Sequence, residues 1–346
     1  MNTPFPFPNA GRPSNRQIVL GRRPNGTPSA DDFAIWHAEI PHVQPGEVLI
    51  RNLFLSVEPA MRGWVNIAAN YGTPVPVGGL MPSFAVGEVI ESRLDGFEVG
   101  DHLMGMFGWQ EYCVAGAGAI KRKILERDLS VSLALGILGV NGITAYFGTV
   151  ETARAARGET LLVSTAAGAV GSAVGQIAKI LGCRVIGIAG GAEKTEWCKS
   201  LGFDVAVDYK APTFAEELAA ACKGGVDVFF DNTAGPVADE AAKHLSRGAR
   251  VVVCGTSSIA TWDPWPVGPR IERALLVKRA SMTGFLVMDY EARYQEAVDW
   301  LAPHVRSGRL AFREDITDGL ESAMPAIGEL YSGVNRGKRL IRLGRA

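Results

Sequence analysis

The glycine spacing that most directly suggests chemistry lies in residues 161–175, which read LLVSTAAGAVGSAVG. This segment follows an expected strand and opens an expected helix, which is the context of a dinucleotide-binding turn. Gly168 would let the backbone approach a pyrophosphate, and Gly171 would let the helix pack closely on the strand. The helix N-terminus would offer N–H groups and a favourable dipole to the phosphates. Ala166 stands where the motif's first glycine is usual, so an ordinary strand–turn–helix packed with small residues is the alternative.

The choice between NAD and NADP is made after the second strand of such a unit. NAD-binding chains place Asp or Glu there, about 20 residues after the glycines. In this chain the corresponding residue is Ala189, and two glycines, Ala192, Glu193 and Lys194 follow. The small loop leaves room for a 2′-phosphate, and Lys194 offers it a positive charge. The pattern favours NADP(H), although Lys194 could be a solvated helix charge, and Glu193 would repel a phosphate that it faced.

Polar residues also follow the later expected strands. Ligands of such sheets bind outside the carboxyl ends of the strands, so residues 231–235 and 254–257 should line the same crevice. Asn232 could bond to ribose or amide groups. An Asn or Cys buried at a strand end is also common without any ligand, and both interpretations stay open here.

The secondary structure expected around these residues differs between the first 127 residues and the rest of the chain. The first 127 residues contain strands and Gly- or Pro-rich turns, which predict a small β-barrel-like domain. From about residue 130, strands and helices alternate, which predicts parallel strands with helices on both faces and hence an α/β fold. The expected strands are 47–56, 83–91, 104–114, 160–164, 183–189, 205–208, 226–231, 250–254 and 338–343. The expected helices are 168–181, 193–201, 213–221, 237–245 and 290–307.

Length and composition restrict the class of protein. A chain of 346 residues is long enough for about two domains. Its 35 Lys and Arg against 36 Asp and Glu leave a net charge of −1, without the basic excess of a nucleic-acid-binding protein. The longest apolar stretch, residues 133–140, is too short to span a membrane. The five Cys form no C-x-x-C pair, and residues 1–13 lack the apolar core of a signal peptide, so we expect a cytoplasmic protein without disulfides.

Several short motifs, spread in order over nearly the whole chain, carry a family resemblance. With them the chain resembles the zinc-independent medium-chain dehydrogenases/reductases, in the branch of leukotriene B4 dehydrogenase, prostaglandin reductase and curcumin reductase. The AAGAVGS segment is particularly typical of this branch. The motifs are NRQIVL at 15–20, LSVEP at 55–59 with MRG at 61–63, GWQEY at 108–112, AAGAVGS at 166–172, GIAG at 187–190 with Glu193 and Lys194, FDN at 230–232, VCG at 253–255, GF at 284–285 and NRGK at 335–338.

The resemblance implies a GroES-like catalytic domain at 1–129, a Rossmann NADP-binding domain at 130–310, and a return to the catalytic domain at 311–346. The cofactor would lie in the cleft between the two domains, and the protein would be a homodimer. The implied reaction is NADPH-dependent reduction of the C=C bond of α,β-unsaturated ketones and aldehydes. The positions that match cofactor contacts are Gly168, Ala169, Val170, Gly171, Lys194, Tyr209, Asn232, Cys254, Gly255, Thr256, Ser257, Phe285, Leu286, Val287 and Asn335.

A metal site is not expected. Catalytic zinc in dehydrogenases of this size uses Cys and His ligands. No His of this chain stands in a ligand-like cluster with a Cys, and the Cys spacing excludes a structural site of four cysteines. We interpret these residues as packing or surface residues; the five His are His37, His42, His102, His244 and His304.

The chain departs from the family pattern at the residues that would donate the proton. Hydride addition at Cβ of an enone puts negative charge on the carbonyl oxygen, and Cα then takes a proton. Relatives often supply tyrosines for this step, but here Phe54, Ala60 and Ala260 stand at those places. Tyr71 is the best remaining phenol, although it could equally be a packing or surface residue. The cofactor's ribose hydroxyl and a water are the alternatives.

The aromatic and sulfur-containing side chains suggest a pocket for a bulky or aromatic substrate, or else ordinary packing. Two other functions stay open. One is a quinone reductase on the same fold, and the other is an NADPH-binding protein that has lost its chemistry. The candidate pocket residues are Met61, Trp64, Tyr71, Trp262, Trp265 and Met288.

Overall fold

The computed structural model describes residues 14–67, 72–259 and 264–344. The chain divides into two compact units. Unit 1 comprises Met1–Leu135 and Glu314–Ala346, and unit 2 comprises Gly136–Arg313. The C-terminal segment therefore packs with the N-terminal part of the chain. Among the helices of the described chain, none is both long and apolar enough to cross a membrane.

Unit 2 is built on a six-stranded sheet in which every neighbouring pair is parallel. The strand order is β10-β9-β8-β11-β12-β13, so the chain runs from β8 to one edge and then from β11 to the other. Such a reversal creates a crevice at the carboxyl ends of the two central strands. The predicted doubly wound sheet is thus confirmed. Its strands are β8 (Thr160–Val163), β9 (Arg184–Ala189), β10 (Val205–Asp208), β11 (Val226–Asp231), β12 (Leu245–Val253) and β13 (Ser281–Gly284).

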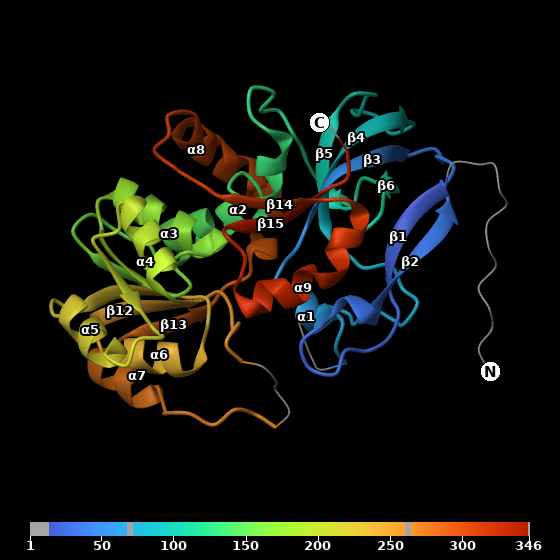
Figure 1. Cartoon of the computed structure of the whole chain (residues 1–346). Helices are drawn as coiled ribbons and strands as arrows, with labels where there is room; N and C mark the ends of the chain where they lie inside the picture. The colour runs from blue at the N-terminus through green and yellow to red at the C-terminus, as the bar shows by residue number, and fades with distance from the viewer. Residues whose placement is uncertain (1–13, 68–71, 260–263, 345–346) are drawn as a thin grey trace. The chain divides into compact units, whose positions relative to one another are not determined.

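The helices of unit 2 cover both faces of this sheet, with α3 and α4 on one side and α6 and α7 on the other (Figure 1). Helix α3 packs closely because Gly175 has no side chain: a Cβ there would lie 1.9 Å from the Phe203 ring. The helices are α2 (Val140–Phe147), η3 (Gly148–Thr152), α3 (Ala169–Leu181), α4 (Ala192–Ser200), α5 (Phe214–Ala221), α6 (Gly235–Ala242), α7 (Glu272–Lys278), η4 (Val287–Arg293) and α8 (Tyr294–Arg306).

Unit 1 is a mostly antiparallel β structure, in agreement with the expected GroES-like domain. Its main sheet has the order β14-β15-β3-β4-β5-β7, and β6 also pairs with β3. The strands are β1 (Ser14–Leu20), β2 (Phe33–Glu39), β3 (Glu47–Ser56), β4 (Phe84–Ser92), β5 (His102–Met106), β6 (Tyr112–Gly116), β7 (Ile120–Lys123), β14 (Glu314–Asp318) and β15 (Lys338–Arg342). The short helices are η1 (Ala30–Asp32), α1 (Met61–Trp64), η2 (Val131–Leu135), η5 (Leu320–Ser322) and α9 (Ala323–Ser332).

Three expected elements were wrong in detail. The strand expected at 104–114 is two strands, β5 and β6, because Gly108 turns the chain with a φ of +74°. The helix expected at 237–245 ends at Ala242, and Leu245 already begins β12. The helix expected from residue 290 begins as the 3-10 helix η4 and becomes α-helical at Tyr294.

Candidate active site

The turn between β8 and α3 has the compact geometry that the glycine spacing predicts. Thr165 is left-handed, with a φ of +52°, and its carbonyl accepts the Gly168 N–H at 2.8 Å. Ala166 lies against β9, where its N–H donates to the Ile188 carbonyl at 2.9 Å. Gly168 then caps α3 in an extended conformation, so the first turn of the helix begins at Ala169.

The two glycines of this turn are required by close contacts. A Cβ on Gly171 would lie 2.3 Å from the Thr165 carbonyl oxygen, and one on Gly168 would lie 2.9 Å from Thr165 Cγ2. The helix can therefore start directly behind the strand. The first N–H groups of an α-helix have no partner within the helix, so Ala169, Val170 and Gly171 provide a cradle suited to an anion. On this observation the chain fits the pyrophosphate of a dinucleotide.

A buried network joins the carboxyl ends of the two central strands. Ser164 follows β8, and its hydroxyl donates to the Asp231 carboxylate at the end of β11, at 2.9 Å. The same hydroxyl accepts the Asn232 N–H at 2.8 Å, and Asn232 Nδ2 donates to the Ser164 carbonyl, also at 2.8 Å. Asp231 further accepts the N–H groups of Thr233 and Ala234. The side chain of Asn232 is thus held at the switch point by backbone and side-chain bonds.

The loop after β12 is attached to the same strand end. The N–H groups of Cys254 and Gly255 donate to the Asp231 carbonyl at 2.8 and 3.2 Å. Ser257 donates through its hydroxyl to the Asn232 carbonyl at 2.9 Å, and both Thr256 and Ser257 are exposed. Burial, and to a smaller extent the charge of Asp231, raises the pKa of the Cys254 thiol to about 12. This thiol is therefore neutral near pH 7 and a poor nucleophile.

Two lysines lie near each other, Lys194 in α4 and Lys210 after β10. The Asp208 carboxylate accepts the N–H groups of Gly191 and Lys210 at 2.8 and 2.9 Å, which fixes the loop after β9 against the end of β10. Lys194 lies in the first turn of α4, and burial together with the nearby Lys210 charge lowers the pKa of its ammonium group. Two ammonium groups that repel each other are a favourable environment for a phosphate.

Tyr209 and the remaining predicted cofactor residues are spread over both units. The Tyr209 ring lies beside Gly190, where an added Cβ would be 2.7 Å from Tyr209 Cε1. Phe285 and Val287 are buried in unit 2, whereas Leu286 between them is 39% exposed. Asn335 belongs to unit 1, where its Nδ2 donates to the Gly337 carbonyl at 3.0 Å.

The predicted substrate-pocket residues have different environments. Met61 is fully buried in the core of unit 1, and Trp64 is partly buried beside Gly72. Trp265 is 77% exposed and Met288 is 41% exposed. Tyr71 and Trp262, as well as Ala260, lie outside the described residues.

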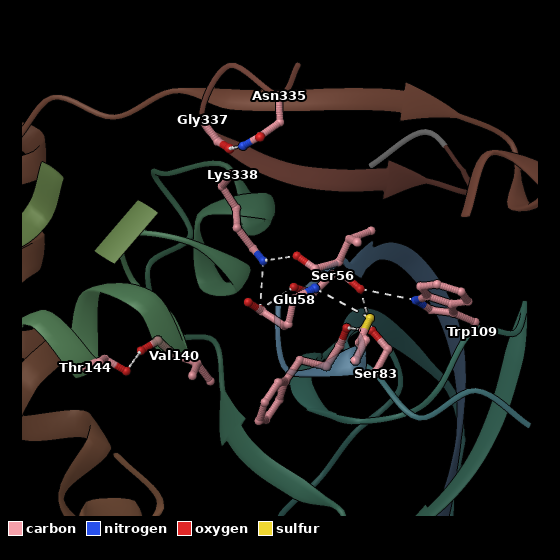
Figure 2. A network of polar contacts seen from close by, with 12 residues as sticks. Ser56, Glu58, Ser83, Trp109, Val140, Thr144, Asn335, Gly337 and Lys338 are labelled. Carbon is pink, nitrogen blue, oxygen red and sulfur yellow. Dashed lines mark hydrogen bonds and ion pairs between the residues drawn. The ribbon is translucent and has the colours of Figure 1, made fainter. Parts of the chain in front are cut away.

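The structure also shows polar residues that the sequence alone did not single out. In unit 2 these are Ser164 and Lys210. In unit 1 it is Lys338, whose buried ammonium contacts Val57 and Glu58 (Figure 2). Their signal in the sequence was weak, because a Ser after a strand or a Lys near a glycine gives no indication of its partners. In residues 14–67, 72–259 and 264–344, no three His, Cys, Asp or Glu side chains gather as a group that could hold a metal ion.

Comparison with known proteins gives consistent results for both units. Residues 16–122 match a family model described as the N-terminal domain of oxidoreductase, and residues 169–303 match one described as zinc-binding dehydrogenase. A putative NADP-dependent oxidoreductase of Bacillus subtilis, YfmJ, is 41% identical over 95% of this chain and 98% of its own. The NADPH-dependent curcumin reductase of Escherichia coli is 38% identical over 95% and 97%, respectively. The NADP⁺-dependent 2-alkenal reductase of Nicotiana tabacum is 36% identical over 96% and 98%.

A solved structure agrees with these relatives. The crystal structure of CurA from Vibrio vulnificus in complex with NADPH is 40% identical, with a TM-score of 0.89 over 96% of this chain and 100% of its own. The fold and the site thus define a two-domain, dinucleotide-dependent oxidoreductase. The chain belongs to the medium-chain dehydrogenase/reductase family, in the branch that contains the curcumin, alkenal and prostaglandin reductases.

Proposed function

We propose that this protein reduces the C=C bond of α,β-unsaturated ketones and aldehydes with NADPH. The observation that carries the proposal is the glycine turn at the N-terminus of α3, at the switch point of the sheet, in a chain whose relatives include NADPH-dependent curcumin and alkenal reductases. NADPH would supply the hydride, which adds to Cβ of the substrate. The chain must hold cofactor and substrate, and it must stabilise the negative charge that develops on the carbonyl oxygen.

We assign cofactor binding to residues at the carboxyl ends of the unit 2 strands and to Asn335. The N-terminus of α3, from Gly168 to Gly171, would hold the pyrophosphate, and Lys194 and Tyr209 would hold the 2′-phosphate. Two observations support this assignment. A Cβ added to Gly168 or Gly171 would collide with Thr165, and the charges of Lys194 and Lys210 lie close enough to repel each other. The other proposed contacts are Asn232, Cys254, Gly255, Thr256, Ser257, Phe285, Leu286 and Val287.

Two measurements test this proposal: the position of deuterium transferred from labelled NADPH, and the classes of substrate that are reduced. With NADPH deuterated at the transferring C4 position, deuterium should appear at Cβ of the saturated product. Label at the carbonyl carbon would identify a carbonyl reductase instead. A panel of enones, enals and quinones distinguishes the other candidates: turnover of quinones alone would identify a quinone reductase, and NADPH binding without any turnover would identify a binding protein.

We further propose that no single side chain is indispensable as the proton donor. General acids usually contribute about 10²–10⁴-fold to the rate. Tyr71→Phe should therefore lower kcat by less than about tenfold, with the ribose hydroxyl or water serving instead. A loss of about a thousandfold with unchanged NADPH affinity would make Tyr71 the acid.

We also propose a reaction that needs no metal. Treatment with a chelator should therefore leave the rate unchanged.

We infer a homodimer from the outer edge of the unit 2 sheet. Strand β13 pairs with β12 on one side, all four of its residues are exposed, and no residue of α7 is buried. Leu276 is 74% exposed and Met282 42%. An open strand edge with apolar neighbours can pair with its own copy across a two-fold axis. Light scattering should give a dimer mass, and Leu276→Glu with Met282→Arg should give a monomer.

The other proposals on partners and location are simpler. We propose a small-molecule substrate, no nucleic-acid partner and no membrane partner. We also propose a cytoplasmic location, which the five free cysteines favour, because thiols stay reduced in that compartment.

A further inference from the structure

The end of β3 and the turn that leads into α1, residues 56–61, accept hydrogen bonds from side chains elsewhere in unit 1. Its Ser56 carbonyl accepts Ser83 Oγ at 2.8 Å and Trp109 Nε1 at 3.2 Å (Figure 2). The Pro59 carbonyl accepts the Tyr331 hydroxyl at 2.9 Å. Ser56 and Val57 are buried, and buried carbonyl groups without hydrogen bonds are costly.

The central contacts of this arrangement are made by the buried ammonium group of Lys338. Lys338 begins β15 and is 5% exposed; its Nζ donates to the Val57 carbonyl at 2.9 Å and pairs with Glu58 Oε1 at 2.7 Å. Ser56 Oγ donates to the same Glu58 oxygen at 2.6 Å. The ammonium therefore ties both the backbone and the side chain of the segment to β15.

The surroundings of Lys338 keep this charge balanced. Glu314, on β14, is its register partner in the parallel β14–β15 pair, so both side chains lie on the same face of the sheet. Glu314 also accepts the Ser132 hydroxyl at 2.9 Å, and burial raises the pKa of its carboxyl group. Glu58 and Glu314 thus face the ammonium from two different elements.

The same lysine is close in the chain to a proposed cofactor contact. Asn335 bonds to the Gly337 carbonyl, and Lys338 follows directly (Figure 2). Met61 ends the segment that Lys338 holds and begins α1, and Trp64 ends that helix. The sequence predicts both residues in a substrate pocket. One side chain therefore connects two segments to which separate roles in binding are assigned.

We propose that Lys338 is a positioning residue, which fixes residues 56–61 relative to the Asn335 loop so that the substrate is held in a reactive orientation. This inference rests on the proposed function. Small errors in the placement of reacting groups reduce rates steeply, by about 10²-fold for a displacement of about 1 Å. The lysine would act through the segment it holds, without touching the reacting atoms.

The test removes both members of the Lys338–Glu58 ion pair. The double variant Lys338→Met with Glu58→Gln is neutral, and its matched control is Arg122→Met with Glu126→Gln, a second buried ion pair of unit 1 with a distance of 2.7 Å. We expect kcat for an enone to fall by about 100-fold in the first variant, with the Kd for NADPH changed by less than about threefold. The control should keep kcat within about threefold of the wild type, as expected for a pair that only stabilises the fold.

A second readout does not depend on activity. Hydrogen exchange of the cofactor-free protein should be faster for a peptide covering residues 56–64 in the Lys338 variant, and unchanged there in the control. Lys338→Arg keeps the charge but not its position, so we expect it to fold and to recover only part of kcat. Wild-type kcat in the neutral double variant or in Lys338→Arg, or unchanged exchange of the peptide, would overturn the proposal. If the wild type itself reduces no enone, the proposed function fails, while the exchange experiment still tests whether Lys338 holds the segment.

Discussion

Ser164 and Asp231 connect the two strands at which the sheet of unit 2 reverses its order. The Ser164 hydroxyl donates to the Asp231 carboxylate at 2.9 Å and at the same time accepts the Asn232 N–H. Both side chains are buried, so their bonds compete little with water. The Ser164 hydroxyl thus helps to place Asn232, a proposed cofactor contact.

Replacing Ser164 by Ala should destabilise the protein and weaken cofactor binding together. The change leaves the buried Asp231 carboxylate without this donor and the partly buried Asn232 N–H without this acceptor, which costs about 1–3 kcal/mol. Urea denaturation should show this loss, and fluorescence titration should show a higher Kd for NADPH. Ser200→Ala is the matched control, because that exposed hydroxyl bonds only within α4 and its loss should cost less than about 0.5 kcal/mol. Equal stability of the two variants would contradict the role given to Ser164.

Gly171→Ala should disturb the cofactor turn. The new methyl group would lie 2.3 Å from the Thr165 carbonyl oxygen, so α3 must move away from β8. We expect a loss of about 1–3 kcal/mol in stability and a marked increase in the Kd for NADPH. Gly224→Ala is the control, because nothing lies within 4 Å of a Cβ at that position. Unchanged NADPH binding in Gly171→Ala would show that this turn does not hold the cofactor.

Lys194→Ala should raise KM for NADPH and leave KM for NADH nearly unchanged. A charge-assisted bond to the 2′-phosphate is worth about 1.5–3 kcal/mol, or roughly 10- to 100-fold. Lys210→Ala should act in the same direction, since its charge lies close enough to lower the pKa of Lys194. Lys199→Ala on the same helix removes only an exposed pair with Glu196 and serves as the control. Equal effects of Lys194→Ala on the two cofactors would contradict the assignment.

The cysteines should resist the electrophilic substrates of the proposed reaction. Burial raises the pKa of Cys113, Cys183 and Cys222 to about 11, and that of Cys198 and Cys254 to about 12. At pH 7.5, a thiol with a pKa of about 11 is thiolate in only about 3 molecules in 10⁴, against about one in ten at an ordinary pKa of about 8.5.

Intact-mass measurement after incubation with an enal, without NADPH, checks this expectation. The native protein should remain unmodified at pH 7.5, whereas the denatured protein should react at its thiols. Below the raised pKa values, any residual reaction should become about tenfold faster per pH unit. Rapid modification of the native protein at pH 7.5 would show that at least one thiol is more acidic than its burial implies.

The sequence alone determined the sheet of unit 2 and the family. Its strands are short apolar runs separated by helices of regular spacing, and its glycines mark a turn in which a side chain would collide with Thr165, so local patterns were sufficient. The same local reasoning failed at residues 104–114, where Gly108 turns a continuous run of strand-forming residues into two strands.

Only the tertiary structure decided which polar side chains meet. Ser164 and Asp231 are 67 residues apart, and Lys338 lies 280 residues from Glu58. A serine hydroxyl or a lysine ammonium carries no pattern in sequence that names its partner. The pairing of β14 with β15 and of β15 with β3 brings Lys338 beside Glu58. Because Lys338 is buried, its charge depends on that partner, since an isolated buried ion is too costly to keep.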